Sequence, residues 1–316
     1  MLFFLFSFLC LTGTVSCTLK HNIAFKDRVK FAPEEVSGAS IKPEIETFPS
    51  VLRKVSKADV VTKPFPHVVV KNCLPEEVYA QLALTYPDYR QIMEIRNSDP
   101  YASNIRLDLS QNEILSGRVP NISSVWKQFV KYHSSQKFYD EVVNIFGESM
   151  RSYLGHHEKR LKKSFSSCKT AVRDSRKVRK DCDISLGVNI GINTPSKFGG
   201  SSVRREHLDR NREIYAGLLY FREEKDKSSG GALEILSCRK KRCKKLPTSK
   251  RNFIRRKIGW DVEYNPSDLQ TSVRVPYEEN AFVFFLNGPL SFHKVTERTE
   301  TTFPRRLVNI IADRAS

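Results

Sequence analysis

Residues 183–193 read Asp-Ile-Ser-Leu-Gly-Val-Asn-Ile-Gly-Ile-Asn, so apolar residues alternate with small or polar ones. Successive side chains of a strand point to opposite faces of a sheet, and a period of two therefore predicts a β-strand. Thr194-Pro195 follows and ends the pattern. We predict that the strand 184–193 opens a β-sheet core.

The chain after this strand continues as a series of short strands. Turn signals such as Ser229-Gly230-Gly231 and Asn287-Gly288-Pro289 separate several of them. The predicted strands are 184–193, 201–209, 214–222, 232–237, 272–276, 281–286, 291–295 and 305–312. Short strands that follow a run of helices predict an α+β protein with a jelly-roll core, in which two sheets form a barrel over about 184–316.

The chain before residue 183 is predicted to supply the helices. One begins at Leu74-Pro75-Glu76-Glu77, because proline suits the first helical turn and acidic residues suit its positive end. Between Ile122 and Leu154, apolar residues recur at spacings of three and four. Residues 64–70 combine prolines with a β-branched run and indicate an edge strand. We expect the N-terminal helices to pack on one side of the sheet core.

The N-terminus has the pattern of a secretory signal. Residues 1–17 form a short apolar run that ends in small residues, and the run is too short to span a bilayer comfortably. An uncleaved anchor is the alternative, and no later segment is apolar enough to cross a membrane. We predict a signal peptide at 1–17, a polar leader at 18–58 and one domain at 59–316. The expected location is the secretory pathway, either the endoplasmic reticulum or Golgi lumen or outside the cell.

Cysteine content and one sequon bear on this location. Five cysteines follow the predicted signal, and the odd number leaves at least one thiol unpaired within the chain. Cys168–Cys182 and Cys238–Cys243 are candidate local disulfides, with five reduced thiols as the alternative. The Asn-x-Ser sequon at Asn121 becomes relevant if the chain is secreted.

The formal net charge of +18 favours acidic partners through long-range attraction. Within a predicted insertion at about 238–270, residues 239–257 contain eleven Lys or Arg and no acid. A solvated loop and a docking arm for an acidic substrate or polyanion both explain this segment. Only Phe253 and Trp260 offer aromatic rings beside it, so a nucleic-acid partner is disfavoured.

His207, Asp209 and His293 form the candidate metal site. Residues i and i+2 of a strand face the same way, so His207 and Asp209 are expected to point together into the barrel. His293 lies on the strand after the buried run 282–286. Two imidazoles and one carboxylate from neighbouring strands suit Fe(II) and leave coordination positions open for oxygen chemistry.

Arg305 and Arg306 are the candidate anion clamp. A cosubstrate with a carboxylate tail needs a bidentate cation, which arginine supplies. The two residues are adjacent on a predicted strand, so only one of them points inward. Arg305 shares its face with Asn309, whose polar side chain is easier to explain beside a wet site than in a packed layer. We favour Arg305 and keep Arg306 as the alternative.

These segments resemble the 2-oxoglutarate- and Fe(II)-dependent dioxygenases, in the neighbourhood of prolyl 4-hydroxylase-like enzymes. The resemblance is strongest to a little-characterised group found in phages and cyanobacteria, and it covers most of residues 60–316. The signal-like N-terminus and the basic insertion depart from that group. The matching segments are 64–67, 192–195, 201–209, 215–220, 228–234, 284–287, 291–296 and 303–309.

The resemblance implies a double-stranded β-helix core and a chemistry. Fe(II) would be held by His207, Asp209 and His293, and 2-oxoglutarate would chelate the metal with its far carboxylate on an arginine. Oxidative decarboxylation would release succinate and CO2 and hydroxylate a protein side chain or a small molecule. Ascorbate is a further candidate cofactor. Asn193 and Tyr220 are further candidates to line the cosubstrate pocket, and neither is assigned a specific role.

Two other classes of function compete with this oxygenase. A non-catalytic binder of acidic glycans or other polyanions would use the basic loops, but it has no need of His207 and Asp209. A cupin-like metalloenzyme without an organic cosubstrate would have no use for the paired arginines 305 and 306.

Overall fold

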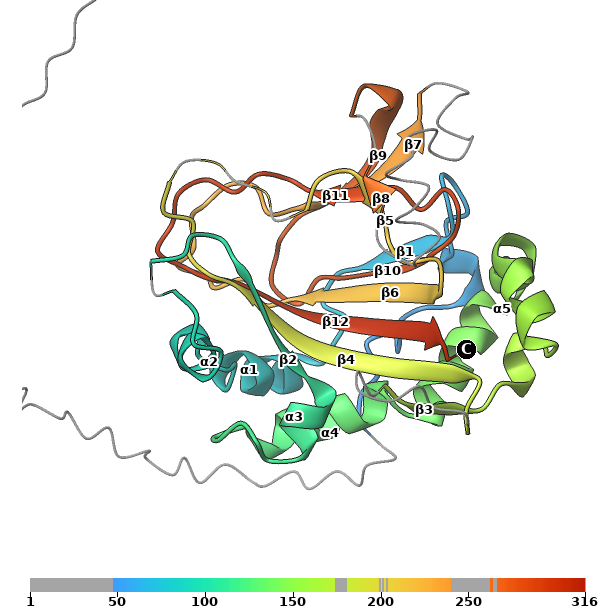
Figure 1. Cartoon of the computed structure of the whole chain (residues 1–316), viewed down its shortest axis with the longest axis horizontal. Helices are drawn as coiled ribbons and strands as arrows, with labels where there is room; N and C mark the ends of the chain where they lie inside the picture. Colours follow the sequence, from blue (N-terminus) through green and yellow to red (C-terminus); the bar gives the residue numbers. More distant parts are fainter. Residues whose placement is uncertain are drawn as a thin grey trace, which may run out of the picture. The chain divides into compact units, whose positions relative to one another are not determined.

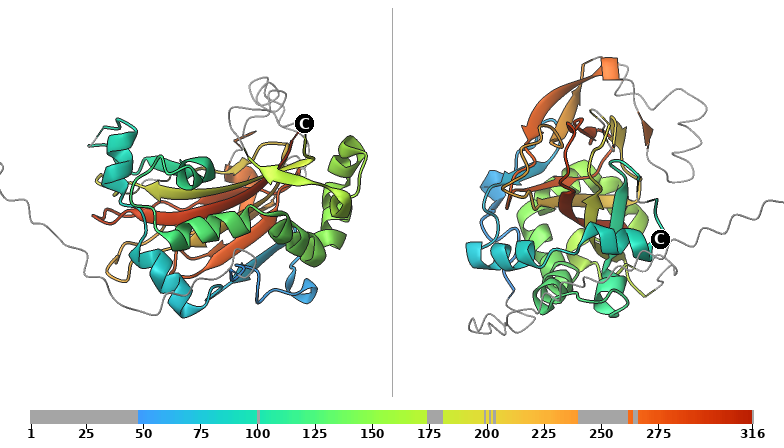
Figure 2. Two further views of the ribbon diagram at one scale, coloured as in Figure 1. Left: turned by 90° about the horizontal axis from the view of Figure 1, so that it is seen from below. Right: turned by 90° about the vertical axis from the view of Figure 1, so that its left-hand side faces the viewer.

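A computed structural model of the protein describes residues 48–99, 101–173, 181–198, 200, 202, 204–239, 262–263 and 266–315. These residues form a mixed α/β structure with two β-sheets and several helices (Figure 1). The helices lie on one side of the larger sheet, and the smaller sheet lies on its other side (Figure 1). The view from below, in which helices cross in front of the strands, agrees (Figure 2).

The larger sheet contains seven strands, all antiparallel except the parallel pair β3 and β4. Its order is β1 (His67–Val70), β10 (Phe282–Leu286), β6 (Glu213–Tyr220), β12 (Arg305–Arg314), β4 (Ile184–Asn193) and β2 (Arg106–Ser110), with β3 (Thr170–Val172) beside β4. The smaller sheet has the order β8 (Val262–Glu263), β5 (His207–Leu208), β11 (His293–Val295), β7 (Leu233–Cys238) and β9 (Leu269–Val275).

The described α-helices all precede β3 in the chain. They are α1 (Glu76–Leu84), α2 (Tyr89–Ile95), α3 (Gln111–Leu115), α4 (Ser124–His133) and α5 (Gln136–Leu161). Short 3-10 helices lie at Lys57–Asp59, Phe165–Ser167 and Pro266–Asp268. The predicted helical region 122–154 is divided because the Ser135 side chain accepts a hydrogen bond from the Phe138 amide and starts a new helix there.

The alternation of side chains gives the larger sheet two different faces. On β10, Phe282, Phe284 and Leu286 pack in the main core with the helices, whereas Val283 and Phe285 belong to a second cluster. The Phe284 ring lies 4.8 Å from the ring of Phe146 on α5. Burial of apolar side chains of this size contributes about 2 kcal/mol each. The helices therefore seal one face and leave the other for the site.

The N-terminal boundary differs from the prediction. Phe48, Val51 and Leu52, which the sequence analysis placed in a polar leader, are buried in the main core. The Val51 amide donates to Nε2 of His133 at 3.1 Å. The predicted leader was therefore too long at its C-terminal end, because three apolar residues among polar ones are enough to anchor the segment.

Most of the predicted strands are present, with shifted ends. The strand predicted at 201–209 is shorter, since β5 contains only His207 and Leu208 among the described residues. Among the described helices and strands, five were not predicted, namely α2, α3, β2, β3 and β8. Most of the basic insertion lies outside the described residues.

The cysteines follow the predictions in part. Cys238 is disulfide-bonded, and the predicted partner Cys243 lies outside the described residues. No disulfide joins Cys168 and Cys182, and Cys168 is a buried free thiol whose Sγ donates to the carbonyl of Ser164. The candidate pairing Cys168–Cys182 is therefore wrong.

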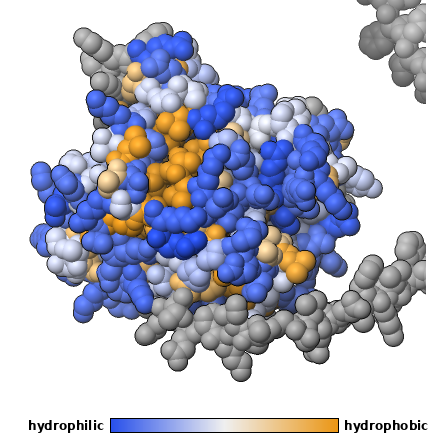
Figure 3. All heavy atoms as spheres, turned by 180° about the vertical axis from the view of Figure 1, so that it is seen from behind, coloured by the Kyte–Doolittle hydropathy of each residue, from blue (hydrophilic) through white to orange (hydrophobic). Residues whose placement is uncertain are grey.

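The surface seen from behind is largely hydrophilic, with an apolar area among the polar residues (Figure 3). In the part of the chain that the structure describes, no helix combines the length and apolar character needed to cross a membrane.

Candidate metal centre

His207, Asp209 and His293 lie together in the structure. The ligand atoms that they offer are all within 4.8 Å of one another. Nε2 of His207 lies 3.3 Å from one carboxylate oxygen of Asp209, and Nε2 of His293 lies 3.3 Å from the other. The three residues predicted from the sequence therefore present two nitrogens and a carboxylate to one point.

Strand pairing brings the two histidines together. β5 runs antiparallel to β11, and His207 is directly opposite His293 in the register. Their ring centroids are 4.2 Å apart, and both side chains are buried. Asp209 follows β5 rather than lying within it, yet its carboxylate reaches the same point.

Backbone carbonyls fix the orientation of both imidazoles. Nδ1 of His207 lies 2.7 Å from the carbonyl oxygen of Arg205, and Nδ1 of His293 lies 2.9 Å from that of Ser291. A carbonyl only accepts, so Nδ1 carries the proton in each ring and Nε2 keeps its lone pair for the site. This is the outer hydrogen bond that metal-binding histidines commonly make.

The charge states at neutral pH also suit a cation. Burial raises the pKa of Asp209, but the neighbouring histidines outweigh burial and hold that pKa well below its usual range. Burial lowers the pKa of His293 to about 4. The site therefore offers an anionic carboxylate beside a neutral imidazole, the protonation states that metal ligation needs.

A cavity of about 510 Å³ opens beside these residues. It lies between the two sheets, because residues of β6, β10 and β12 line it together with residues of β5, β7 and β11. Its lining includes His207, Asp209, His293, Arg305, Asn309, Leu218, Leu233, Phe285 and Val295.

Arg305 lines this cavity and has unused hydrogen-bonding capacity. Its Nε donates to the carbonyl of Gly231 at 2.9 Å, and its Nη1 lies 3.5 Å from Oδ1 of Asn193. Its Nη2, the Nδ2 of Asn193 and the hydroxyl of Tyr220 are buried without a hydrogen-bond partner among the described residues. Such buried donors are costly unless something accepts from them, and a carboxylate accepts from several at once.

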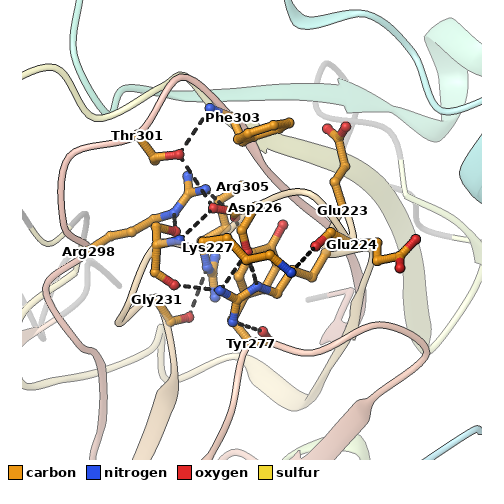
Figure 4. A network of polar contacts seen from close by, with 12 residues as sticks. Glu223, Glu224, Asp226, Lys227, Gly231, Tyr277, Arg298, Thr301, Phe303 and Arg305 are labelled. Carbon is orange, nitrogen blue, oxygen red and sulfur yellow. Dashed lines mark hydrogen bonds and ion pairs between the residues drawn. The ribbon is translucent and has the colours of Figure 1, made fainter.

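Aromatic rings and a buried ion pair hold the Arg305 guanidinium in place. It lies 5.1 Å from the ring centroid of Tyr220 and 5.2 Å from that of Tyr277. The guanidinium of Arg298 lies 5.7 Å from the Tyr277 centroid and contacts Asp226 at 2.6 Å (Figure 4). Arg298 and Asp226 are both buried, so they form a rigid support beside Arg305.

Arg306 has a different environment. Its guanidinium lies 5.1 Å from the ring centroid of Tyr86, and its Nε donates to the carbonyl of Phe221. Arg306 does not line the cavity, whereas Arg305 and Asn309 do. The geometry thus favours Arg305 over Arg306 as the inward arginine, and its role in binding a cosubstrate stays a prediction.

Sequence reasoning missed several residues of this region. Arg106, Arg173, Arg204 and Arg210 also line the cavity. They lie on an unpredicted edge strand or in connecting segments, where no local period marks an inward side chain. The buried Arg298 was also missed, because its position in a polar stretch gives no sign of burial.

No protein-family model matches the chain, and no curated protein sequence matches it. Solved structures do match. One is a prolyl-4-hydroxylase from Pseudomonas putida, 13% identical, with a TM-score of 0.37 over 82% of this chain and 98% of that chain. Another is SnoK, a non-heme alpha ketoglutarate dependent carbocyclase from nogalamycin biosynthesis, 10% identical, with a TM-score of 0.42 over 85% and 88%.

A third match is a prolyl hydroxylase in complex with a hypoxia inducible factor peptide fragment, from Trichoplax adhaerens. It is 8% identical, with a TM-score of 0.40 over 82% of this chain and 89% of that chain. The printed descriptions of these three structures name two prolyl hydroxylases and one alpha ketoglutarate dependent carbocyclase. The narrower resemblance to phage and cyanobacterial proteins stays a prediction. Because the TM-scores are below 0.5, these similarities carry no functional argument, and the functional assignment rests on the site geometry.

Proposed function

We propose that the protein is an Fe(II)- and 2-oxoglutarate-dependent dioxygenase, an oxidoreductase built on a double-stranded β-helix. The supporting observation is the convergence of His207 and His293 on Asp209, at the wall of a cavity that Arg305 also lines. The chain alternates between the two sheets at β4, β5, β6 and β7, as a jelly roll requires.

The residues present fit both bound groups of such an enzyme. Two imidazole nitrogens and one carboxylate suit Fe(II) and leave open positions. The unpaired donors of Arg305, Asn193 and Tyr220 suit the far carboxylate of 2-oxoglutarate. When bound, Fe(II) and 2-oxoglutarate supply an O2-dependent oxidative decarboxylation that gives succinate, CO2 and a hydroxylated product.

Each group of residues has a role in this proposal. The carbonyls of Arg205 and Ser291 keep Nε2 of the two histidines aimed at the site. Arg305 orients the cosubstrate by its carboxylate, and Tyr277 with the Arg298–Asp226 pair holds Arg305 still. Leu218, Leu233, Phe285 and Val295 give the cavity an apolar wall that limits water around the reacting atoms.

The substrate is proposed to be a protein side chain, as for prolyl hydroxylases, or a small molecule. A cavity of about 510 Å³ has the size of a small-molecule site and also admits one extended side chain. Ascorbate has no support from the described residues.

Succinate formation from 2-oxoglutarate by the reduced, Fe(II)-loaded protein tests this function. We expect slow turnover without substrate and its loss in Asp209→Asn, together with about a hundred-fold weaker metal affinity by calorimetry. Asp108→Asn is the matched control, because Asp108 lines the same cavity but pairs with Arg106. Wild-type protein that binds neither metal nor 2-oxoglutarate would exclude the oxygenase.

We also propose that the protein acts in the secretory pathway. The disulfide at Cys238 fits an oxidising compartment, and Asn121 of the sequon is exposed. In secreting cells the wild-type chain should shift in gel mobility on glycosidase treatment, and Asn121→Gln should not shift. A chain that carries no glycan and is found in the cytosol would contradict this location.

A further inference from the structure

The cavity beside the metal centre carries more positive than negative side chains. Its lining contains five arginines, Arg106, Arg173, Arg204, Arg210 and Arg305, and three carboxylates, Asp108, Asp209 and Glu213. Arginines on several walls of one concave site raise the local concentration of anions. An arginine is available to bind an anion only if its guanidinium is not already held by a carboxylate.

Most of these arginines are engaged. Arg106 forms a salt bridge with Asp108 at 2.7 Å, and Arg173 forms one with Asp313 at 3.1 Å. Arg305 is the arginine proposed for the cosubstrate. Arg204 lies 3.8 Å from Asp209, a long contact to a carboxylate that would also be a metal ligand.

Arg210 differs from the others. Its guanidinium makes no hydrogen bond or close ion pair with any residue that the structure describes, and its charge acts on the carboxylate of Asp313 only through a longer electrostatic interaction. Its backbone is fixed, because its carbonyl accepts from Nδ2 of the buried Asn287 at 3.1 Å and from the Glu213 amide at 3.0 Å. Arg210 is half-buried and directly follows Asp209. A fixed backbone therefore presents to the cavity, next to the candidate metal site, a cation that has no direct hydrogen-bonded partner among the described residues.

We propose that Arg210, assisted by Arg204, binds an anionic group of the substrate, a carboxylate or a phosphate, and so holds that substrate beside the metal centre. That the bound anion belongs to a substrate rests on the proposed oxygenase function, whereas anion binding itself depends only on the side chains of Arg210 and Arg204. Arginine binds either group through paired N–H donors, and partial burial strengthens the contact relative to a surface arginine.

A competing explanation is that both arginines are solvated surface charges. Arg204 does have an exposed side chain, with 47% of its surface accessible. Arg210 is the stronger evidence, because it is half-buried and faces a cavity. A solvated charge would bind anions no better than any other arginine on the surface, and this difference can be measured.

Thermal unfolding of the full-length protein provides the first test. Sulfate, which represents phosphate, and acetate, which represents a carboxylate, are each compared with chloride at equal ionic strength. Saturating 2-oxoglutarate and anaerobic Fe(II) are present, so that Arg305 is occupied. We expect at least one anion to raise the Tm of the wild-type protein in a saturable way, because it binds the folded state only. A Tm increase with sulfate indicates a phosphate site, and a Tm increase with acetate indicates a carboxylate site.

Substitutions of Arg210 test whether the anion binds at this residue. Arg210→Gln should weaken the apparent affinity for the anion about ten-fold or more, and Arg210→Lys should restore part of it. Arg151→Gln removes one exposed charge from α5 and is the matched control, with no expected change. No saturable shift in the wild-type protein, or the same shift in Arg210→Gln, would overturn the proposal.

A second experiment distinguishes anion binding at Arg210 from 2-oxoglutarate binding at Arg305. Arg305→Gln should lose the response to 2-oxoglutarate and keep the anion response, because Arg210 remains. A peptide pair that differs only by Glu in place of Gln is then compared by fluorescence anisotropy with wild-type protein and Arg210→Gln. A preference for Glu that Arg210→Gln abolishes supports a carboxylate, and a preference that persists in Arg210→Gln counts against the site.

Discussion

At the scale of single residues, Arg305 and Arg306 show how one position along a strand separates two roles. Arg305 lines the cavity, while Arg306 stacks near Tyr86 and contacts the carbonyl of Phe221. We expect Arg305→Gln to weaken 2-oxoglutarate binding about ten- to hundred-fold, the usual range for a lost charged hydrogen bond. Arg306→Gln should bind 2-oxoglutarate like the wild-type protein, and calorimetry on both variants checks this. Equal losses in the two variants would contradict the assignment.

The buried pair Asp226–Arg298 is a second prediction at this scale. Asp226→Asn leaves the Arg298 charge buried without a carboxylate, which costs about 3–5 kcal/mol of unfolding free energy in comparable pairs. Urea unfolding measures this change. Glu278→Gln breaks the exposed pair with Lys71 and should change the stability by less than about 1 kcal/mol. A small effect of Asp226→Asn would show that Arg298 is not confined as described.

At the scale of elements, the start of β7 depends on Gly230. It has a φ of +83°, and a Cβ there would collide with the backbone of Glu297 and Arg298. Gly230→Ala should therefore cost about 1–3 kcal/mol of stability and weaken 2-oxoglutarate binding, because the carbonyl of Gly231 holds Arg305. Gly155→Ala in α5 meets no atom within 4 Å and should stabilise the protein by up to about 1 kcal/mol. Thermal unfolding with and without 2-oxoglutarate compares the two.

The smaller sheet carries a chain of ion pairs close to the histidines. Lys294 lies 3.1 Å from Glu206 and 3.3 Å from Glu234, and Arg274 contacts Glu234 at 2.6 Å. Glu206 precedes His207 and Lys294 follows His293, so these pairs link the strands that carry the two histidines of the candidate metal site. Ion pairs in such a network fix the spacing of strands better than isolated pairs do.

At the scale of the whole molecule, buried histidines predict a dependence of stability on pH. Burial lowers the pKa of His133 and of His157 to about 3 in each case, from an ordinary 6.5. The unfolded chain therefore binds protons that the folded chain excludes. The contribution of these histidines to the free energy of unfolding should be fully present above about pH 6.5. It should fall as the pH decreases toward 3, by about 1.4 kcal/mol per pH unit for each histidine.

Urea unfolding of the metal-free protein between pH 4 and pH 8 checks this prediction. His157→Gln should flatten the slope, because the Arg314 guanidinium that donates to His157 can donate to the amide instead. His156→Gln should change the slope less, because the exposed His156 is only a secondary cause, after burial, of the lowered pKa of His157. An identical slope in His157→Gln and wild-type protein would contradict the prediction.

The spacing of apolar residues along the chain was enough to predict the main strands and the face on which each of their side chains lies. Alternation in 184–193 and 305–312 predicted β4 and β12 and put Arg305 and Asn309 on one face, because side chains of a strand alternate. The candidate metal ligands were also predictable, since His-x-Asp and a distant His are residue types with a recognisable chemistry. Short elements such as α3 and β2 were missed, because a few residues carry too little of a period.

The pairing of the strands and the residues that meet between the two sheets follow from long-range packing, which local sequence patterns do not encode. The opposition of His207 and His293 depends on the register of β5 against β11, which no local pattern encodes. The same holds for the position of Arg210 in the cavity wall and for the burial of Arg298 against Asp226 and Tyr277. These contacts join residues far apart in the chain. Their environment is a property of the packed sheets, and the residue types alone leave it open.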